Sequence, residues 1–126
     1  MSYSGWIGVD LDGTLAKYQG WNNGEIGEPI PLMVERVKKW IADGVEVKIF
    51  TARVGFGGGY SAESGRSDDE RFADEQRKSI EKWCEKHIGA VLPVTATKDF
   101  RMIELWDDRA IQVIPNTGIP IQEITK

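Results

Sequence analysis

Four short polar groups along the chain each follow an apolar or β-branched stretch, and their residue types could do chemistry together. They are Asp10-Leu11-Asp12-Gly13-Thr14, Thr51-Ala52-Arg53, Lys98 and Asp107-Asp108. Carboxylates gathered at one spot repel one another unless a cation neutralises them. Hard oxygen ligands suit Mg²⁺, which keeps several waters and is completed by substrate phosphate. The set therefore predicts a magnesium site that also binds a phosphoryl group.

The spacing of the first two acids suits a covalent reaction. Asp10 and Asp12 are two residues apart, so they face the same side of an extended chain. With a cation present, one carboxylate can attack phosphorus, and the other can protonate the leaving oxygen and later activate water. Backbone N–H groups of Gly13 and Thr14 could bind the phosphate. With one histidine and one cysteine, a zinc site is not expected.

The elements that must position these groups follow from the hydrophobic pattern. Strands are expected at 6–9, 45–50, 91–97, 102–106 and 111–114, with helices beginning near Pro31 and Ser67 and ending near Gly44 and Gly89. The alternation predicts an α/β fold: a Rossmann-like core with a mostly parallel five-stranded sheet flanked by helices. In such a sheet, ligands bind beyond the carboxyl ends of the strands, where the four polar groups lie.

With these motifs in order along nearly the whole chain, the sequence resembles the haloacid dehalogenase-like (HAD) superfamily of phosphohydrolases. The resemblance rests on Asp10-Leu11-Asp12-Gly13-Thr14-Leu15 and on the three later groups. It implies that Asp10 is the nucleophile and Asp12 the general acid/base. It also implies that Thr51 supplies a phosphate-binding hydroxyl and that Lys98 is the lysine of the third motif.

The same resemblance implies the metal ligands. Mg²⁺ would be held by Asp10, the backbone carbonyl of Asp12 and an acid of the Asp107-Asp108 pair, with Asp108 favoured over Asp107. Thr51-Ala52-Arg53 and Asp107-Asp108-Arg109 also look like the 3′-phosphatase domain of phage-type polynucleotide kinase-phosphatases. That likeness makes Arg53 a candidate ligand of the substrate phosphate. Other stretches are similar to small HAD-like proteins of phages and bacteria, which imply no substrate.

We therefore expect a Mg²⁺-dependent phosphomonoester phosphatase that acts through an aspartyl-phosphate on Asp10. A nucleotide or a polynucleotide end is a candidate substrate, and Trp21, in a glycine-rich segment, either stacks on its base or sugar or covers the edge of the core. Two alternatives stay open. One is a receiver-like phospho-acceptor domain, and the other is a non-catalytic binding module that kept the fold.

Composition narrows the setting of this chemistry. The chain has 126 residues and a net charge of −4, which argues against a general nucleic-acid coat protein. One domain over 1–126 is expected, without a cap domain, because 16–30 and 54–67 are too short to form one. No signal peptide or membrane span is apparent, and the single cysteine fits a reducing compartment, so we expect a cytoplasmic protein. Its oligomeric state stays open, and a homodimer with contacts from the loop at 55–67 is one hypothesis.

Overall fold

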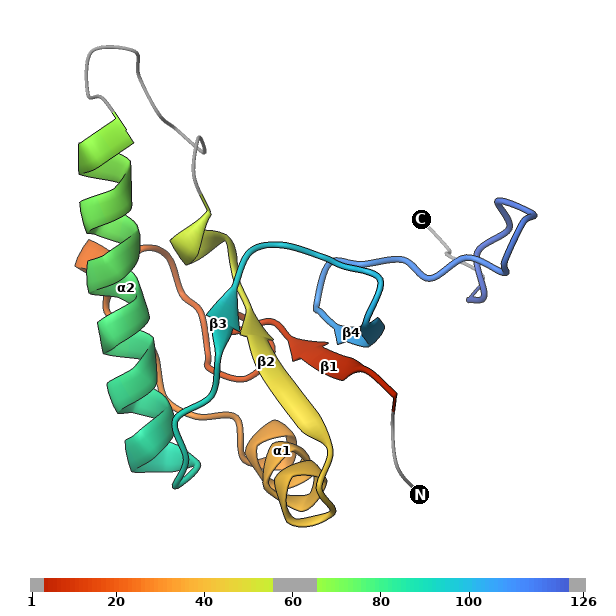
Figure 1. Cartoon of the computed structure of the whole chain (residues 1–126), viewed down its shortest axis with the longest axis horizontal. Helices are drawn as coiled ribbons and strands as arrows, with labels where there is room; N and C mark the ends of the chain where they lie inside the picture. The colour runs from red at the N-terminus through yellow and green to blue at the C-terminus, as the bar shows by residue number, and fades with distance from the viewer. Residues whose placement is uncertain (1–3, 56–65, 123–126) are drawn as a thin grey trace.

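The computed structural model describes residues 4–55 and 66–122, and it is an α/β arrangement (Figure 1). The strands are β1 (Trp6–Val9), β2 (Glu46–Phe50), β3 (Val94–Thr95) and β4 (Met102–Trp106), the helices are α1 (Pro31–Ala42) and α2 (Arg66–His87), and two short 3-10 turns are η1 (Asn22–Gly24) and η2 (Ala52–Val54). The strands form a parallel sheet in the order β3-β2-β1-β4. This arrangement is compatible with a Rossmann-like fold and confirms the predicted α/β class.

The prediction of a fifth strand is wrong for the described residues, whose sheet has four strands. Residues 109–122 project from the sheet as an arm, drawn in blue in Figure 1. Within the arm, the backbone N–H of Ile114 donates to Ile119 at 2.7 Å, and that of Ile121 donates to Gln112 at 2.8 Å. The apolar run at 111–114 has β-strand character, but it pairs with the next few residues of the chain instead of with β4.

Helix α1 has a recognisable signal at each end. Pro31 occupies its first turn, where the missing N–H has no intrahelical partner to lose. At the other end Gly44 has a φ of +80°, and Val45 N–H donates to Trp40 O at 2.9 Å. This is a Schellman ending, which glycine permits without strain. The helix therefore ends as its sequence predicts, and the chain turns directly into β2.

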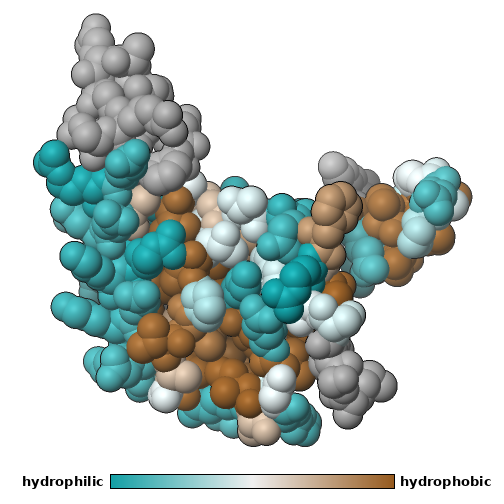
Figure 2. All heavy atoms as spheres, in the orientation of Figure 1, coloured by the Kyte–Doolittle hydropathy of each residue, from teal (hydrophilic) through white to brown (hydrophobic). Residues whose placement is uncertain are grey.

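Both helices pack against one face of the sheet. Val47 and Ile49 of β2 are buried in the same core as Val37 of α1 and Ile80 of α2. Lys48, which lies between those two strand residues and points to the other face, is only half-buried. Cys84 of α2 also lies in the core, where burial raises the pKa of its thiol to about 12. Figure 2 shows hydrophilic side chains along the outer side of α2 and hydrophobic ones on the projecting arm.

Among residues 4–55 and 66–122, no helix is both long enough and apolar enough to cross a bilayer.

Candidate functional site

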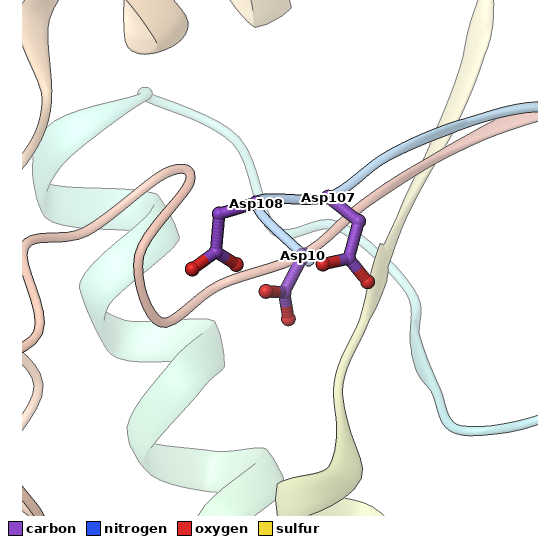
Figure 3. A group of neighbouring side chains, drawn as sticks. All are labelled: Asp10, Asp107 and Asp108. Carbon is purple, nitrogen blue, oxygen red and sulfur yellow. The ribbon is translucent and has the colours of Figure 1, made fainter. Parts of the chain in front are cut away.

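Three carboxylates meet where two neighbouring strands end. The register of the parallel pair sets Val9 of β1 beside Trp106 of β4, so the next residues, Asp10 and Asp107, leave the sheet side by side. The backbone N–H of Asp10 donates to Trp106 O at 2.9 Å, which fixes this junction. Ligand oxygens of Asp10, Asp107 and Asp108 all lie within 4.8 Å of one another, and Figure 3 shows their carboxylates pointing to one side.

The environment of Asp10 opposes its ionisation. The pKa of its carboxyl rises to about 7, first because burial removes water from the charge. The negative charge of Asp107 and the hydrogen bond and charge of Asp108 raise it further. A carboxyl that is half neutral near pH 7 is one that a cation would hold in its ionised form.

The donor set fits Mg²⁺. All three groups offer carboxylate oxygens, two of the residues are half-buried, and Asp108 is exposed to solvent, so water ligands can reach the same place. Asp10, Asp107 and Asp108 are the residues that would hold such an ion. The backbone carbonyl of Asp12, which was predicted as a ligand beside Asp10 and one acid of the Asp107-Asp108 pair, stays a prediction.

Asp108 lies against the loop that follows β1. Gly13 has a φ of +90°, and a Cβ there would lie 2.5 Å from Asp108 Oδ2. The Thr14 hydroxyl donates to Asp108 Oδ1 at 3.4 Å. The glycine is therefore required twice, for its backbone conformation and for the approach of the carboxylate. The predicted phosphate-binding residues thus contact one of the acids that are predicted to bind the metal.

The side chain of Asp12 belongs to a different contact. Arg53 Nε donates to Asp12 Oδ2 at 2.7 Å, and Nη2 donates to Oδ1 at 2.8 Å. This bidentate pair is largely shielded, with 3% of the Arg53 side chain and 21% of the Asp12 side chain exposed. Two parallel bonds to a planar fork fix both the position and the plane of the carboxylate.

Arg53 also connects the loop after β1 to helix α2. Its Nη1 donates to Gly24 O at 2.6 Å and to Gln76 Oε1 at 2.9 Å. Trp21 covers the guanidinium, which lies 4.8 Å from the centroid of the indole ring. The sequence did not predict the role of Gln76, because a glutamine on a helix gives no sign that it contacts an arginine far away in the sequence. The predicted contact of Arg53 with a substrate phosphate stays a prediction. In the structure its guanidinium donates to Asp12, Gly24 and Gln76.

Two other predicted residues are placed less directly. Thr51 follows β2 and is buried, and its Oγ1 accepts a hydrogen bond from Arg53 N at 3.2 Å, which caps the turn η2. Lys98 lies in the loop after β3 with an exposed side chain. Within the described part of the chain, no ion pair or hydrogen bond joins Lys98 to the acids. Phosphate binding by Thr51 and Lys98 stays a prediction.

Trp21 also contacts a second side chain of the protein, on helix α2. Its ring lies 6.0 Å from that of Phe72 of α2, and 44% of the residue remains exposed. These contacts agree with the alternative in which Trp21 covers an edge of the core, while stacking on a substrate stays a prediction. The loop at 55–67, predicted as a dimer contact, falls almost wholly within 56–65, outside the described residues.

A shallow cavity of about 300 Å³, wide open to solvent and not predicted from the sequence, lies beside the acids. Its lining joins the loop after β1 and the end of β4 to the first turns of α1, and consists of Gly13, Thr14, Ile30, Leu32, Met33, Arg36, Trp106, Asp107 and Asp108. The sequence holds only a weak signal of this cavity. Trp106 directly precedes the paired acids, and Arg36 follows Met33 by one helical turn.

Comparison with known proteins supports the fold. No protein-family model and no curated protein matches the chain. A solved structure of a conserved protein from Bacteroides thetaiotaomicron is similar to it, with a TM-score of 0.55 and 20% sequence identity. The similarity covers 90% of this chain and 83% of that one. At this identity it shows a shared fold alone, and function must be argued from the site.

Proposed function

We propose that this protein is a Mg²⁺-dependent phosphomonoester phosphatase of the HAD type, with Asp10 as its nucleophile. The observation that carries the proposal is the meeting of Asp10, Asp107 and Asp108 within 4.8 Å at the carboxyl ends of β1 and β4. Such a cluster is costly without a cation and a use for it. The motif-like order of the four polar groups in the sequence supports the same reaction.

The reaction takes two displacements at phosphorus. An oxygen of Asp10 bonds to phosphorus as the bond to the ester oxygen breaks, and that leaving oxygen takes a proton from Asp12. Asp12 then accepts a proton from water, which attacks phosphorus and frees inorganic phosphate and the Asp10 carboxylate. A bound Mg²⁺ supplies positive charge that offsets the phosphoryl oxygens and the acids.

Arg53 serves this scheme by positioning Asp12. In the second displacement Asp12 must present its carboxylate to the attacking water, and a carboxylate is the form that the two bonds from Arg53 favour. The two bonds from Arg53, together with its contacts to Gly24 and Gln76, restrict the rotamers of Asp12. The backbone N–H groups of Gly13 and Thr14 donate within their own loop, to Ala16 O at 2.8 Å and to Leu11 O at 3.3 Å. The Thr14 hydroxyl, which contacts Asp108, is the donor of this loop that lies beside the acids, where a phosphoryl oxygen would need one.

A metal-dependent assay tests the proposed function. Purified full chain is incubated with p-nitrophenyl phosphate, with Mg²⁺ or with EDTA, and release of p-nitrophenol is followed. We expect turnover that requires Mg²⁺ and that falls by at least about 10³-fold in Asp10→Asn. The matched control is Asp43→Asn, which changes an exposed acid at the end of α1. Equal turnover in Asp10→Asn and the wild type would overturn the role of Asp10.

A panel of esters then addresses the substrate. Nucleoside monophosphates and oligonucleotides with a 3′- or 5′-phosphate are compared by kcat/KM. A preference for oligonucleotide ends over mononucleotides supports end processing, and a preference for mononucleotides excludes it as the main role.

A further inference from the structure

The cavity beside the acids is continuous with the proposed reaction site. Thr14, Asp107 and Asp108 line both, so one molecule can place a phosphoryl group at Asp10 and its organic part in the cavity. The remaining walls are mostly apolar, formed by Ile30, Leu32, Met33 and Trp106. Water finds few hydrogen-bond partners against such walls, so binding of an apolar group that displaces this water is favoured.

One wall of the cavity is flat and held in place. Trp106 Nε1 donates to Glu104 Oε1 at 3.0 Å, and the Trp40 ring meets the Trp106 ring nearly edge-on, with centroids 5.3 Å apart. The guanidinium of Arg36 lies 4.8 Å from the centroid of the Trp106 ring. These contacts fix an indole and a guanidinium in the cavity before any ligand arrives, which lowers the entropic cost of binding.

Arg36 has capacity left for a ligand. Its Nη1 lies 3.6 Å from Met33 Sδ, which is a weak acceptor. Among the described residues no carboxylate forms an ion pair with it, although Asp107 and Asp108 line the same cavity. A guanidinium in this state can stack on an aromatic ring and donate to polar atoms at the edge of that ring.

We propose that this cavity binds an aromatic ring of the substrate, so that the preferred substrates are phosphate monoesters carrying an aryl or heteroaryl group. The proposal rests on the proposed phosphatase function for its phosphate and on the cavity for its ring. A volume of about 300 Å³ stands at the lower end of the range for small-molecule sites, which suits one ring or two fused rings. Two sources share this chemistry: simple aryl phosphates and nucleotides.

The experiment measures selectivity between esters. KM is determined for 1-naphthyl phosphate, adenosine 5′-monophosphate and glycerol 2-phosphate with the full chain and Mg²⁺. We expect the ratio of KM for glycerol 2-phosphate to KM for the better aromatic ester to exceed about tenfold, equivalent to about 1.4 kcal/mol. The aromatic ester with the lower KM shows whether simple aryl phosphates or nucleotides are preferred. The two differ in the distance between phosphate and ring, because a sugar separates them in the nucleotide.

Two variants test the cavity itself. Leu32→Ser alters an exposed rim residue, and Arg36→Met keeps an unbranched stem while removing the planar cation. Each should lower the selectivity ratio by about five- to tenfold. The control is Val91→Ser, which alters a similarly exposed apolar residue outside the cavity and should leave the ratio unchanged. Comparing each ester across variants cancels its intrinsic reactivity.

A binding measurement separates the two proposals. Calorimetry follows 1-naphthol, which has no phosphate, binding to the full chain without Mg²⁺. If no ester is hydrolysed but 1-naphthol binding weakens in both cavity variants, the phosphatase proposal fails and the aromatic site stands. If esters are hydrolysed without aromatic preference, or if neither variant changes the ratio or 1-naphthol binding, the aromatic site is overturned.

Discussion

The guanidinium of Arg53 holds the carboxylate of Asp12 by two hydrogen bonds, of 2.7 and 2.8 Å, across 41 positions of sequence. Arg53 comes from the turn after β2, and Asp12 from the loop after β1. The pair fixes the relative position of two loops that follow adjacent strands. It also leaves the carboxylate of Asp10 to gather with Asp107 and Asp108, so the two acids of the first motif have separate environments.

Arg53→Gln should destabilise the fold and impair turnover together. Removing the cation leaves Asp12 partly buried without its partner, which should lower the free energy of unfolding by about 3 kcal/mol. Urea denaturation measures this loss. Arg101→Gln is the comparison, because the Arg101–Glu46 pair is exposed and its loss should cost less than about 1 kcal/mol. Equal effects of the two substitutions would show that the Arg53–Asp12 pair has no special weight.

Positioning of Asp12 by Arg53 predicts a leaving-group effect. Arg53→Lys keeps the charge but loses the bidentate geometry. It should slow hydrolysis of alkyl phosphates, whose leaving oxygens need a proton, more than that of p-nitrophenyl phosphate, whose leaving oxygen needs little assistance. A purely structural role would lower kcat for both esters equally, and that result would refute the positioning role.

Removal of the Asp10 charge should stabilise the metal-free protein at high pH. The pKa of Asp10 in the fold is about 7, above its unfolded value near 4, so between these values the folded state binds more protons than the unfolded state. The free energy of unfolding therefore falls as pH rises through this window. In EDTA, Asp10→Asn should gain about 1–2 kcal/mol at pH 8 and almost nothing at pH 4, as measured by thermal unfolding.

Asp99 provides a control of opposite sign. It accepts a hydrogen bond from Trp6 Nε1 at 2.9 Å, which lowers the pKa of its carboxyl. Its contribution to stability is present above the unfolded pKa and is lost as pH falls through the folded pKa. Asp99→Asn should therefore reduce stability at pH 8 and converge with the wild type in acid. Parallel pH profiles for the Asp10 and Asp99 variants would contradict both assignments.

Mg²⁺ should raise the melting temperature of the wild type. A ligand that binds only the folded state at 100 times its Kd adds about 2.7 kcal/mol to the free energy of unfolding. Asp108→Asn should lose most of this gain, since it removes one of the three acids. Asp43→Asn should keep it. An equal Mg²⁺ effect in the Asp108 variant would place the ion elsewhere.

Gly13→Ala should weaken the metal site beyond its cost in stability. Both Gly13 and Gly44 have a positive φ, +90° and +80°, so alanine strains the backbone at either position by about 1–2 kcal/mol. A Cβ at Gly13 would lie 2.5 Å from Asp108 Oδ2, whereas one at Gly44 would meet nothing within 4 Å. Gly44→Ala should thus lose stability and keep its Mg²⁺ affinity, as measured by calorimetry. If both variants keep that affinity, Asp108 does not need its approach to Gly13.

The sequence predicted those parts of the fold that depend on local pattern. Four strands and both helices were expected, as was Gly44 at the end of α1, because amphipathic spacing and terminal glycines act over a few residues. The segment 111–114 was misassigned, since a short apolar run does not specify its pairing partner, and here it pairs within the projecting arm.

The candidate site could be predicted in part for a related reason. The meeting of Asp10 with Asp107 follows from strand order, which the α/β alternation suggests. Two other features depend on how the helices pack on the sheet. They are the contact of Arg53 with Gln76 and the cavity that Arg36 and Trp106 both line. No spacing rule in a single sequence encodes those contacts.

Direct detection of the covalent intermediate tests the central claim. Asp12→Asn keeps the shape of the side chain but removes the acid/base, and the good leaving group of p-nitrophenyl phosphate makes the first displacement independent of it. Rapid mixing with Mg²⁺ should give a burst of about one p-nitrophenol per protein, followed by slow turnover, with a hydroxylamine-sensitive phosphate on the peptide containing Asp10. Steady turnover without a burst or a labelled peptide, or label on a different residue, would contradict an aspartyl-phosphate on Asp10.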